Sequence, residues 1–283
     1  MNEQNKIYLC AISNIESGTC NEDCKFCTQS VKYKADIQRY KLKPIEEIIK
    51  EAKIAKENKA IGYCLVTAGA GLTDERVEFV SKVAHTLKKE LPDLSLIACN
   101  GIASIEQLKE LKKNGIDNYN HNLESSKEYY PSICSTHSWE DRYTTCQNVK
   151  SVGLNLCSGG IFGMGETSED RISMLNSIKE LEPMSVPLNF FHHNEALPLK
   201  KSDLSVEHSF ELISTTRKIL GENVMIMVAG GREITFKEKQ YDIFKYGANA
   251  IVVGNYLTTS GKVASQDIEN ITKLGYTIAD SCH

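Results

Sequence analysis

Short apolar segments alternate with longer amphipathic segments along the chain. The apolar segments have the length expected of buried strands, and they cover residues 7–13, 62–67, 94–98, 118–121, 154–158, 186–190, 224–228 and 250–253. In the segments between them, apolar residues recur every three or four positions, as on one face of a helix. These predicted helices cover residues 44–58, 74–89, 104–114, 139–151, 169–181, 206–220 and 237–246.

The segment 44–58 shows the helical pattern most clearly, with Pro44 at its start and two acidic residues in its first turn. Gly115 and Gly247 stand where two of the helices should end. Strands that alternate regularly with helices predict parallel β/α units. We therefore expect an α/β fold, a (β/α)8 barrel, whose active site lies at the carboxyl ends of the strands.

The composition is that of an ordinary globular protein. Hydrophobic residues make up 41% and charged residues 25% of the chain, and the net charge is −4. No linker or low-complexity segment divides the sequence, so we expect one domain over residues 1–283. The slightly negative net charge does not indicate nucleic-acid binding. The chain has no apolar run of membrane-spanning length and no signal-peptide pattern. These features predict a cytoplasmic protein that binds neither nucleic acid nor a membrane.

Ten cysteines are unusual for such a protein, because a reducing compartment disfavours disulfides. Cys20, Cys24 and Cys27 are spaced C-x3-C-x2-C directly after the first predicted strand. A structural zinc site would normally need a fourth protein ligand, and a C-x2-C redox pair would leave Cys20 without a role. Three thiolates fit a [4Fe–4S] cluster that keeps one iron open for another ligand.

This loop resembles the hallmark of the radical S-adenosylmethionine (SAM) superfamily. The resemblance implies that SAM binds the open iron through its amine and carboxylate and is cleaved to a 5′-deoxyadenosyl radical. It also implies that Phe26, which precedes the last cysteine of the loop, lies against the adenine of SAM.

Three further cysteines, Cys64, Cys99 and Cys157, lie in three different predicted strands. Each could point into the barrel, because side chains alternate along a strand. Each could equally be a small core residue, as buried cysteines usually are. Three of them in a protein that already binds iron and sulfur favour a second metal site. We assign no role to the other four cysteines, Cys10, Cys134, Cys146 and Cys282.

Four longer motifs resemble the biotin synthase family within this superfamily. They are "YNHNLE" at 119–124, "CSGGIFGMGET" at 157–167, "SVPLN" at 185–189 and "AGGRE" at 229–233. The resemblance extends over residues 7–276 and implies that Cys64, Cys99 and Cys157 hold a [2Fe–2S] cluster.

The same resemblance implies that Arg232 is the fourth ligand of this cluster. Arginine is an unusual ligand because its guanidinium stays protonated and has no acceptor. From the residue type alone, pairing of Arg232 with a carboxylate is the favoured interpretation.

The resemblance also implies contacts to SAM and to the substrate. Asn122 would contact both, Glu124 the ribose hydroxyls, and Arg142 the carboxylate of SAM. Glu124 stands where the family commonly has aspartate. Asn189 would contact the ureido ring of dethiobiotin, and the hydroxyls near its carboxylate tail would come from Thr258 and Thr259.

The activity that the resemblance implies is conversion of dethiobiotin to biotin, a sulfurtransferase reaction that inserts sulfur between carbons 9 and 6. Two SAM-derived radicals would activate the carbons and the [2Fe–2S] cluster would be the sacrificial sulfur donor, so no side chain is assigned as catalytic. A homodimer and a flavodoxin- or ferredoxin-type electron donor are implied as well. The alternatives are a radical SAM mutase or maturase without sulfur insertion, and a non-catalytic iron–sulfur carrier or sensor.

Overall fold

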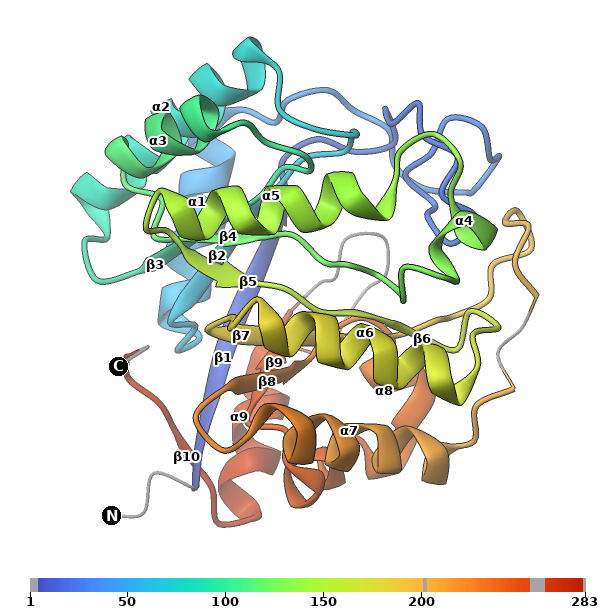
Figure 1. Ribbon diagram of the computed structural model, residues 1–283. Helices are drawn as coiled ribbons and strands as arrows, with labels where there is room; N and C mark the ends of the chain where they lie inside the picture. The colour runs from blue at the N-terminus through green and yellow to red at the C-terminus, as the bar shows by residue number, and fades with distance from the viewer. Residues whose placement is uncertain (1–4, 201–202, 255–262, 282–283) are drawn as a thin grey trace.

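The computed structural model describes residues 5–200, 203–254 and 263–281. Parallel strands form a barrel, and most of the helices pack around its outside (Figure 1). The strands are β1 (Lys6–Asn14), β2 (Gly62–Val66), β3 (Ser95–Cys99), β4 (Asn118–Asn120), β5 (Asn155–Cys157), β6 (Gly160–Phe162), β7 (Ser185–Phe190), β8 (Met225–Val228), β9 (Ala250–Val252) and β10 (Thr277–Ile278).

Pairing between β1 and β9 closes the barrel. The strands follow one another in the order β1-β2-β3-β4-β5-β7-β8-β9, and Tyr8 and Cys10 of β1 lie opposite Ala250 and Val252 of β9. The predicted (β/α)8 barrel is confirmed, and each predicted strand is found at its expected place. Two short strands were not predicted: β6, which pairs with β7, and β10, which pairs with the start of β1.

The predicted helices are found in order with one correction, and three further helices, Tyr130–Ile133, Arg232–Phe236 and Ala264–Lys273, were not predicted. The helices are α1 (Ile45–Glu57), α2 (Asp74–Glu90), α3 (Ile105–Lys113), α4 (Tyr130–Ile133), α5 (Trp139–Ser151), α6 (Ser168–Glu180), α7 (Val206–Leu220), α8 (Arg232–Phe236) and α9 (Ala264–Lys273). The predicted helix 237–246 is instead two 3-10 segments, Lys237–Lys239 and Asp242–Tyr246. Lys237 has φ 47°, where a right-handed helix cannot continue, so the segment is broken at its start.

Alternation along the strands decides which side chains enter the barrel. On β2, Tyr63 and Leu65 are 1% and 0% exposed and belong to the main core between the sheet and the helices. Cys64 lies between them in sequence and therefore faces the barrel interior. The same argument places Cys99 in the barrel interior, because Leu96 and Ala98 of β3 belong to the main core between the sheet and the helices.

Candidate functional site

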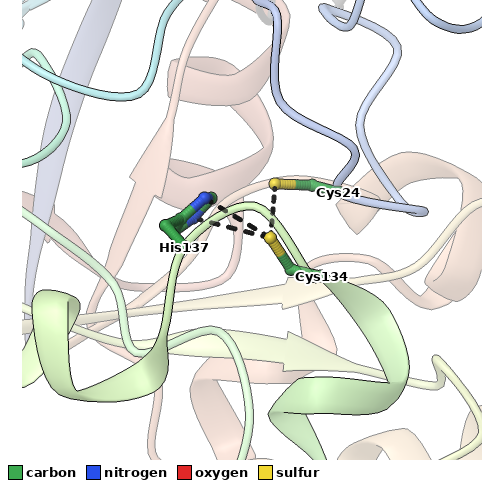
Figure 2. A group of neighbouring side chains, drawn as sticks. All are labelled: Cys24, Cys134 and His137. Carbon is green, nitrogen blue, oxygen red and sulfur yellow. Dashed lines mark hydrogen bonds between the residues drawn. The ribbon is translucent and has the colours of Figure 1, made fainter.

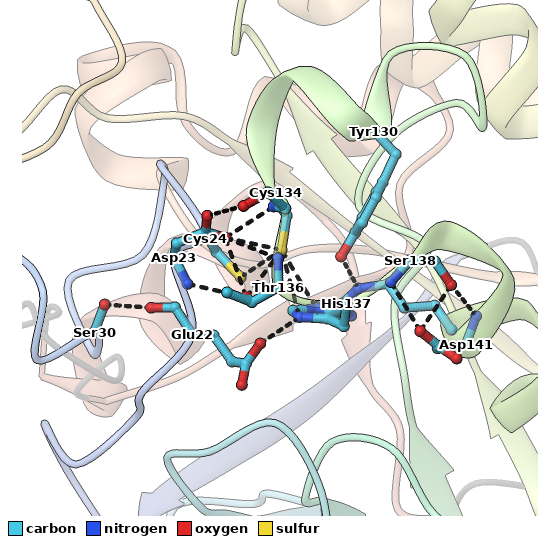
Figure 3. Close-up of polar contacts among 12 residues, drawn as sticks. Glu22, Asp23, Cys24, Ser30, Tyr130, Cys134, Thr136, His137, Ser138 and Asp141 are labelled. Atoms are coloured by element: carbon cyan, nitrogen blue, oxygen red, sulfur yellow. Dashed lines mark hydrogen bonds and ion pairs between the residues drawn. The ribbon is translucent and has the colours of Figure 1, made fainter.

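The loop with three cysteines is attached to the segment that follows α4, and Figure 3 shows the contacts between them. The Asp23 carboxylate accepts hydrogen bonds from the backbone N–H groups of Ser135 and Thr136, at 2.8 and 3.2 Å. The backbone N–H of Lys25 donates to the carbonyl of Ile133 at 2.8 Å. Burial opposes ionisation of Asp23, but the hydrogen bonds from Ser135 and Thr136 lower its pKa overall. The loop is thus held in place by the protein alone.

The thiols of this loop suit a metal cluster. Cys20 and Cys24 are buried and Cys27 is partly exposed. Burial raises the pKa of Cys20, and it raises that of Cys27 to about 11. Thiols in such surroundings remain protonated without a cation, whereas an iron cluster deprotonates the thiols that it binds. The donor set therefore fits a cluster held by three cysteines.

The structure adds a fourth thiol that sequence reasoning left without a role. Cys134 Sγ lies 3.6 Å from Cys24 Sγ and 3.4 Å from His137 Nδ1 (Figure 2). The hydrogen bond between the two thiols and burial raise the pKa of Cys24, and the same bond lowers that of Cys134. The C-x2-H spacing of Cys134 and His137 is the pattern that could have pointed to them.

Arg142 connects this region to the end of β4. Its Nε donates to the Tyr130 hydroxyl at 2.6 Å, and its Nη1 donates to the Asn122 carbonyl at 2.9 Å. The Glu124 carboxylate lies 3.8 Å from the same Nη1. Burial raises the pKa of Glu124, while the charge of Arg142 opposes that shift. Three of the predicted SAM contacts, Asn122, Glu124 and Arg142, are therefore brought together.

Glu124 also has an uncommon backbone conformation. Its φ is 67°, in the left-handed region that non-glycine residues seldom adopt. Hydrogen bonds on both sides hold it there, because its N–H donates to the Gly159 carbonyl and its own carbonyl accepts from Ile161 N–H. Such conformations cluster at functional sites, where the surrounding structure imposes them.

The second set of cysteines lies inside the barrel. A hydrogen bond between Cys64 and Cys99 raises the pKa of the first thiol and lowers that of the second. Cys157 lies at the end of β5, and its charge is a smaller cause of the rise at Cys64. Asn120 Nδ2 lies 3.2 Å from Cys99 Sγ. The structure thus brings Cys64 and Cys99 together, and the metal site shared with Cys157 stays a prediction.

Two buried polar atoms beside this set are suited to a bound molecule. Asn120 Oδ1 and His121 Nε2 make no hydrogen bond within the part of the chain that the structure describes. Burying a polar atom without a partner costs free energy, so a ligand at the end of this barrel strand could satisfy them. Cys10, which received no role in the sequence analysis, is buried and packs against Met227 and Val252.

Arg232 has the environment that its residue type alone favours. Its Nη1 and Nη2 donate to the two carboxylate oxygens of Asp267, both at 3.1 Å, and Nη1 also donates to Gln240 at 2.6 Å. The side chains of Arg232 and Asp267 are 1% and 0% exposed. A ligand role for Arg232 would require this bidentate pair to open. The ligand role stays a prediction.

Removing one member of this buried pair should destabilise the fold strongly. We expect Asp267→Ala to lower the free energy of unfolding by about 3–5 kcal/mol, because it removes the bidentate partner of a buried charge and leaves only the more distant Glu233 carboxylate, at 3.7 Å. Urea denaturation measures the loss. Asp242→Ala is the matched control, because it breaks an exposed pair with Lys245 and should cost at most about 1 kcal/mol. Equal losses in the two variants would contradict the structural role of Asp267.

The remaining predicted residues differ in how far the structure places them. Phe26 is partly buried and packs against the main core. The Asn189 amide bridges two backbone segments: Nδ2 donates to the Gly160 carbonyl at 3.2 Å, and Oδ1 accepts from Gly230 N–H at 2.8 Å. Thr258 and Thr259 lie outside the described residues.

Comparisons with known proteins place the chain in a family. Residues 15–178 match the family described as the radical SAM superfamily, and residues 187–277 match the biotin and thiamin synthesis associated domain. The chain is 66% identical over 279 residues to the biotin synthase of Aliarcobacter butzleri, and the match covers 99% of both chains. It is 60% identical over 278 residues to the biotin synthase of a Nitratiruptor species, covering 98% of this chain and 99% of the relative.

Solved structures show the same fold at much lower identity. A methylornithine synthase superposes with a TM-score of 0.82 at 19% identity, covering 97% of this chain and 84% of that one. The FeFe-hydrogenase maturase from Carboxydothermus hydrogenoformans gives 0.84 at 15% identity, covering 98% and 69%. These two likenesses concern the barrel only. With 66% identity to one biotin synthase, 60% to another and a match to the radical SAM superfamily, the chain belongs to the biotin synthase family of radical SAM enzymes.

Proposed function

We propose that the protein converts dethiobiotin to biotin by inserting sulfur between carbons 9 and 6. Family membership implies a [4Fe–4S] cluster, a [2Fe–2S] cluster and SAM as cofactors, as the sequence predicted. Once bound, these cofactors supply the radical chemistry and the sulfur, while the barrel binds and orients them. Cys20, Cys24 and Cys27 would hold the first cluster, and the second would be held by Cys64, Cys99 and Cys157, with Arg232 as the fourth ligand that the family resemblance predicts.

One observation carries this proposal: a second set of cysteines, Cys64, Cys99 and Cys157, lies on strands β2, β3 and β5 of the barrel, apart from the loop with three cysteines. The charges of Glu124 and Arg142 act on Cys27 of the loop and on Cys99 of the barrel interior, although burial at Cys27 and the Cys64 hydrogen bond at Cys99 are the larger causes of their pKa shifts. Groups that bind SAM from this position would hold it between the two sets. A mutase with one cluster needs no second set of thiols.

The residues of the chain have separate tasks in this proposal. Arg142 donates toward an anionic group and Glu124 accepts from hydroxyls, which suits the carboxylate and the ribose of SAM. Asn122 Oδ1 accepts from Gly159 N–H at 3.1 Å, so the asparagine also fixes the loop after β5. Substrate contacts by Asn122, Asn189, Thr258 and Thr259 rest on the family resemblance.

The proposal extends to the organisation of the protein. Both matched regions supply strands to one closed barrel, which supports a single domain over residues 1–283. None of the nine described cysteines forms a disulfide. Among the described residues no helix is long and apolar enough to cross a membrane. The homodimer and the flavodoxin- or ferredoxin-type donor are proposed by family resemblance.

The test of the function is anaerobic turnover. Protein reconstituted with iron and sulfide, given SAM, a reductant and dethiobiotin, should form biotin detectable by mass spectrometry. Six irons per chain are expected for two clusters. Four irons, with deoxyadenosine formed but no biotin, would instead favour the mutase or maturase alternative. Bound iron without deoxyadenosine would favour a carrier or sensor.

Glu124 should matter for SAM affinity. We expect Glu124→Ala to weaken SAM binding by about 1–3 kcal/mol, because donors that face the carboxylate lose a charged acceptor. Glu124→Asp is the matched control and should be nearly neutral, since it keeps the acceptor. Equilibrium dialysis measures both. Normal affinity in the alanine variant would mean that another residue binds the ribose.

A further inference from the structure

The thiols of Cys24 and Cys134 and the imidazole of His137 form a compact set of donors (Figure 2). Their donor atoms all lie within 4.8 Å of one another, with 3.6 Å between the two sulfurs and 3.4 Å between Cys134 Sγ and His137 Nδ1. In a tetrahedral zinc site the metal–sulfur and metal–nitrogen bonds of about 2.3 and 2.0 Å set neighbouring donors roughly 3.5–3.8 Å apart. The observed spacings match those of ligands to one metal ion.

These donors are also buried and held in place. Cys24 and Cys134 are 7% and 3% exposed, and the His137 side chain is 8% exposed. Asp23 fixes the Cys134 segment through the backbone of Ser135 and Thr136, so the two loops are joined without a metal. A site of this kind requires little rearrangement to bind an ion.

The charges around the set suit a divalent cation. Glu22 Oε2 lies 2.8 Å from His137 Nδ1 and is within reach as a fourth ligand (Figure 3). Arg142 Nη2 lies 3.2 Å from His137 Nε2. A metal ion at Nδ1 would leave the imidazole proton on Nε2, so the Arg142 guanidinium, which can only donate, would have to turn away when the ion binds. Two thiolates would neutralise the ion, and their protons would leave to solvent when it binds.

From this geometry we propose that Cys24, Cys134 and His137 form a site for a single thiophilic divalent ion, Zn²⁺ or Fe²⁺, in the chain that lacks its four-iron cluster. Cys24 cannot serve this ion and the cluster at once, so the two occupants exclude each other. A bound ion would therefore occupy Cys24 before the cluster assembles or compete with its assembly. This role of the site goes beyond the proposed conversion of dethiobiotin.

Cobalt is the probe, because Co²⁺ reports thiolate and imidazole ligands through its visible absorption. Full-length protein, freed of iron under anaerobic reducing conditions, should bind Co²⁺ with thiolate charge-transfer bands, and Zn²⁺ should displace it. Cys134→Ala and His137→Gln should each weaken Co²⁺ binding at least about tenfold. Cys134→Ser, which keeps the size and polarity of the side chain, guards against misfolding and should weaken binding as well. Circular dichroism checks the fold of every variant.

Cys20→Ala is the matched control, since it removes a buried thiol of the same loop that lies outside the set. Its Co²⁺ affinity should stay within about threefold of the parent. If Cys20→Ala weakens binding while Cys134→Ala does not, the loop cysteines alone bind the ion and the proposal is wrong. X-ray absorption of Cys99→Ala with one equivalent of Zn²⁺, a variant in which the set inside the barrel is incomplete, should show two sulfurs with nitrogen or oxygen completing the shell. Three or more sulfurs would also overturn it.

Cluster assembly gives an independent readout that does not depend on biotin formation. One equivalent of Zn²⁺ should slow the appearance of four-iron cluster absorbance during reconstitution of the parent protein. The same addition should have little effect on Cys134→Ala, whose cluster ligands are intact. Equal inhibition in both proteins would contradict a shared Cys24.

Discussion

Cys20→Ala and Cys27→Ala should each abolish deoxyadenosine formation from SAM. Each residue is one of three proposed anchors of the [4Fe–4S] cluster, and a thiolate lost from such a set leaves an iron without a ligand. We expect the four irons of that cluster to be lost and deoxyadenosine to fall to the level of protein-free controls. Chromatography of deoxyadenosine and iron analysis on anaerobically reconstituted protein measure both effects.

Asn21→Ala is the control for this experiment, because Asn21 is exposed in the same loop and bears no thiol. It should keep full cleavage of SAM. Wild-type rates in Cys20→Ala or Cys27→Ala would overturn the assignment of the loop.

Cys24 should behave differently from its two neighbours. The sequence predicts equal effects for all three cysteines, because no spare ligand is near them in the chain. In the structure, Cys134 Sγ lies 3.6 Å from Cys24 Sγ and can reach the same iron. Cys24→Ala should therefore retain part of its cluster, and the double variant with Cys134→Ala should lose it.

Cys99→Ala should abolish biotin formation but leave SAM cleavage intact. Cys99 belongs to the set inside the barrel, while the loop cysteines are anchored by separate contacts to the segment after α4. Iron should fall from six to four per chain, and deoxyadenosine should still form. Cys146→Ala is the matched control, since Cys146 is a buried cysteine outside both sets. It should keep six irons and make biotin.

Loss of SAM cleavage in Cys99→Ala would show that the two sets do not act separately. Biotin formation at the parent rate in the same variant would remove Cys99 from the sulfur-donating site. Either result can be told apart from misfolding, because iron content and deoxyadenosine are measured on the same sample.

The barrel could be predicted from the sequence because strand and helix periodicities are local. Each strand carries its apolar pattern in a few consecutive residues, and the alternation of Tyr63, Cys64 and Leu65 already decides which side chain faces inward. The helix predicted at 237–246 is not found, although the composition of the segment favours a helix. The backbone of Lys237, with φ 47°, interrupts it. Backbone geometry of that kind depends on neighbouring segments.

The site was predictable where a motif is contiguous and not where contacts join distant segments. Cys20, Cys24 and Cys27 can be identified directly from their spacing. Cys134 meets Cys24 only after more than a hundred intervening residues have folded, so no local pattern indicates the contact. The carboxylate that pairs with Arg232 could not be identified for the same reason, because Asp267 lies on α9, which was not predicted.

Closure of the barrel between β1 and β9 has a consequence for synthesis of the chain. Until Ala250–Val252 has left the ribosome, β1 has a partner on one side only. At about 5–20 residues per second, the interval between the two strands lasts roughly ten to fifty seconds. During that time an open strand edge, on a chain that already carries nine of its ten cysteines, is exposed to other nascent chains. Translation that stalls before β9 should therefore yield aggregates rather than a partly folded barrel.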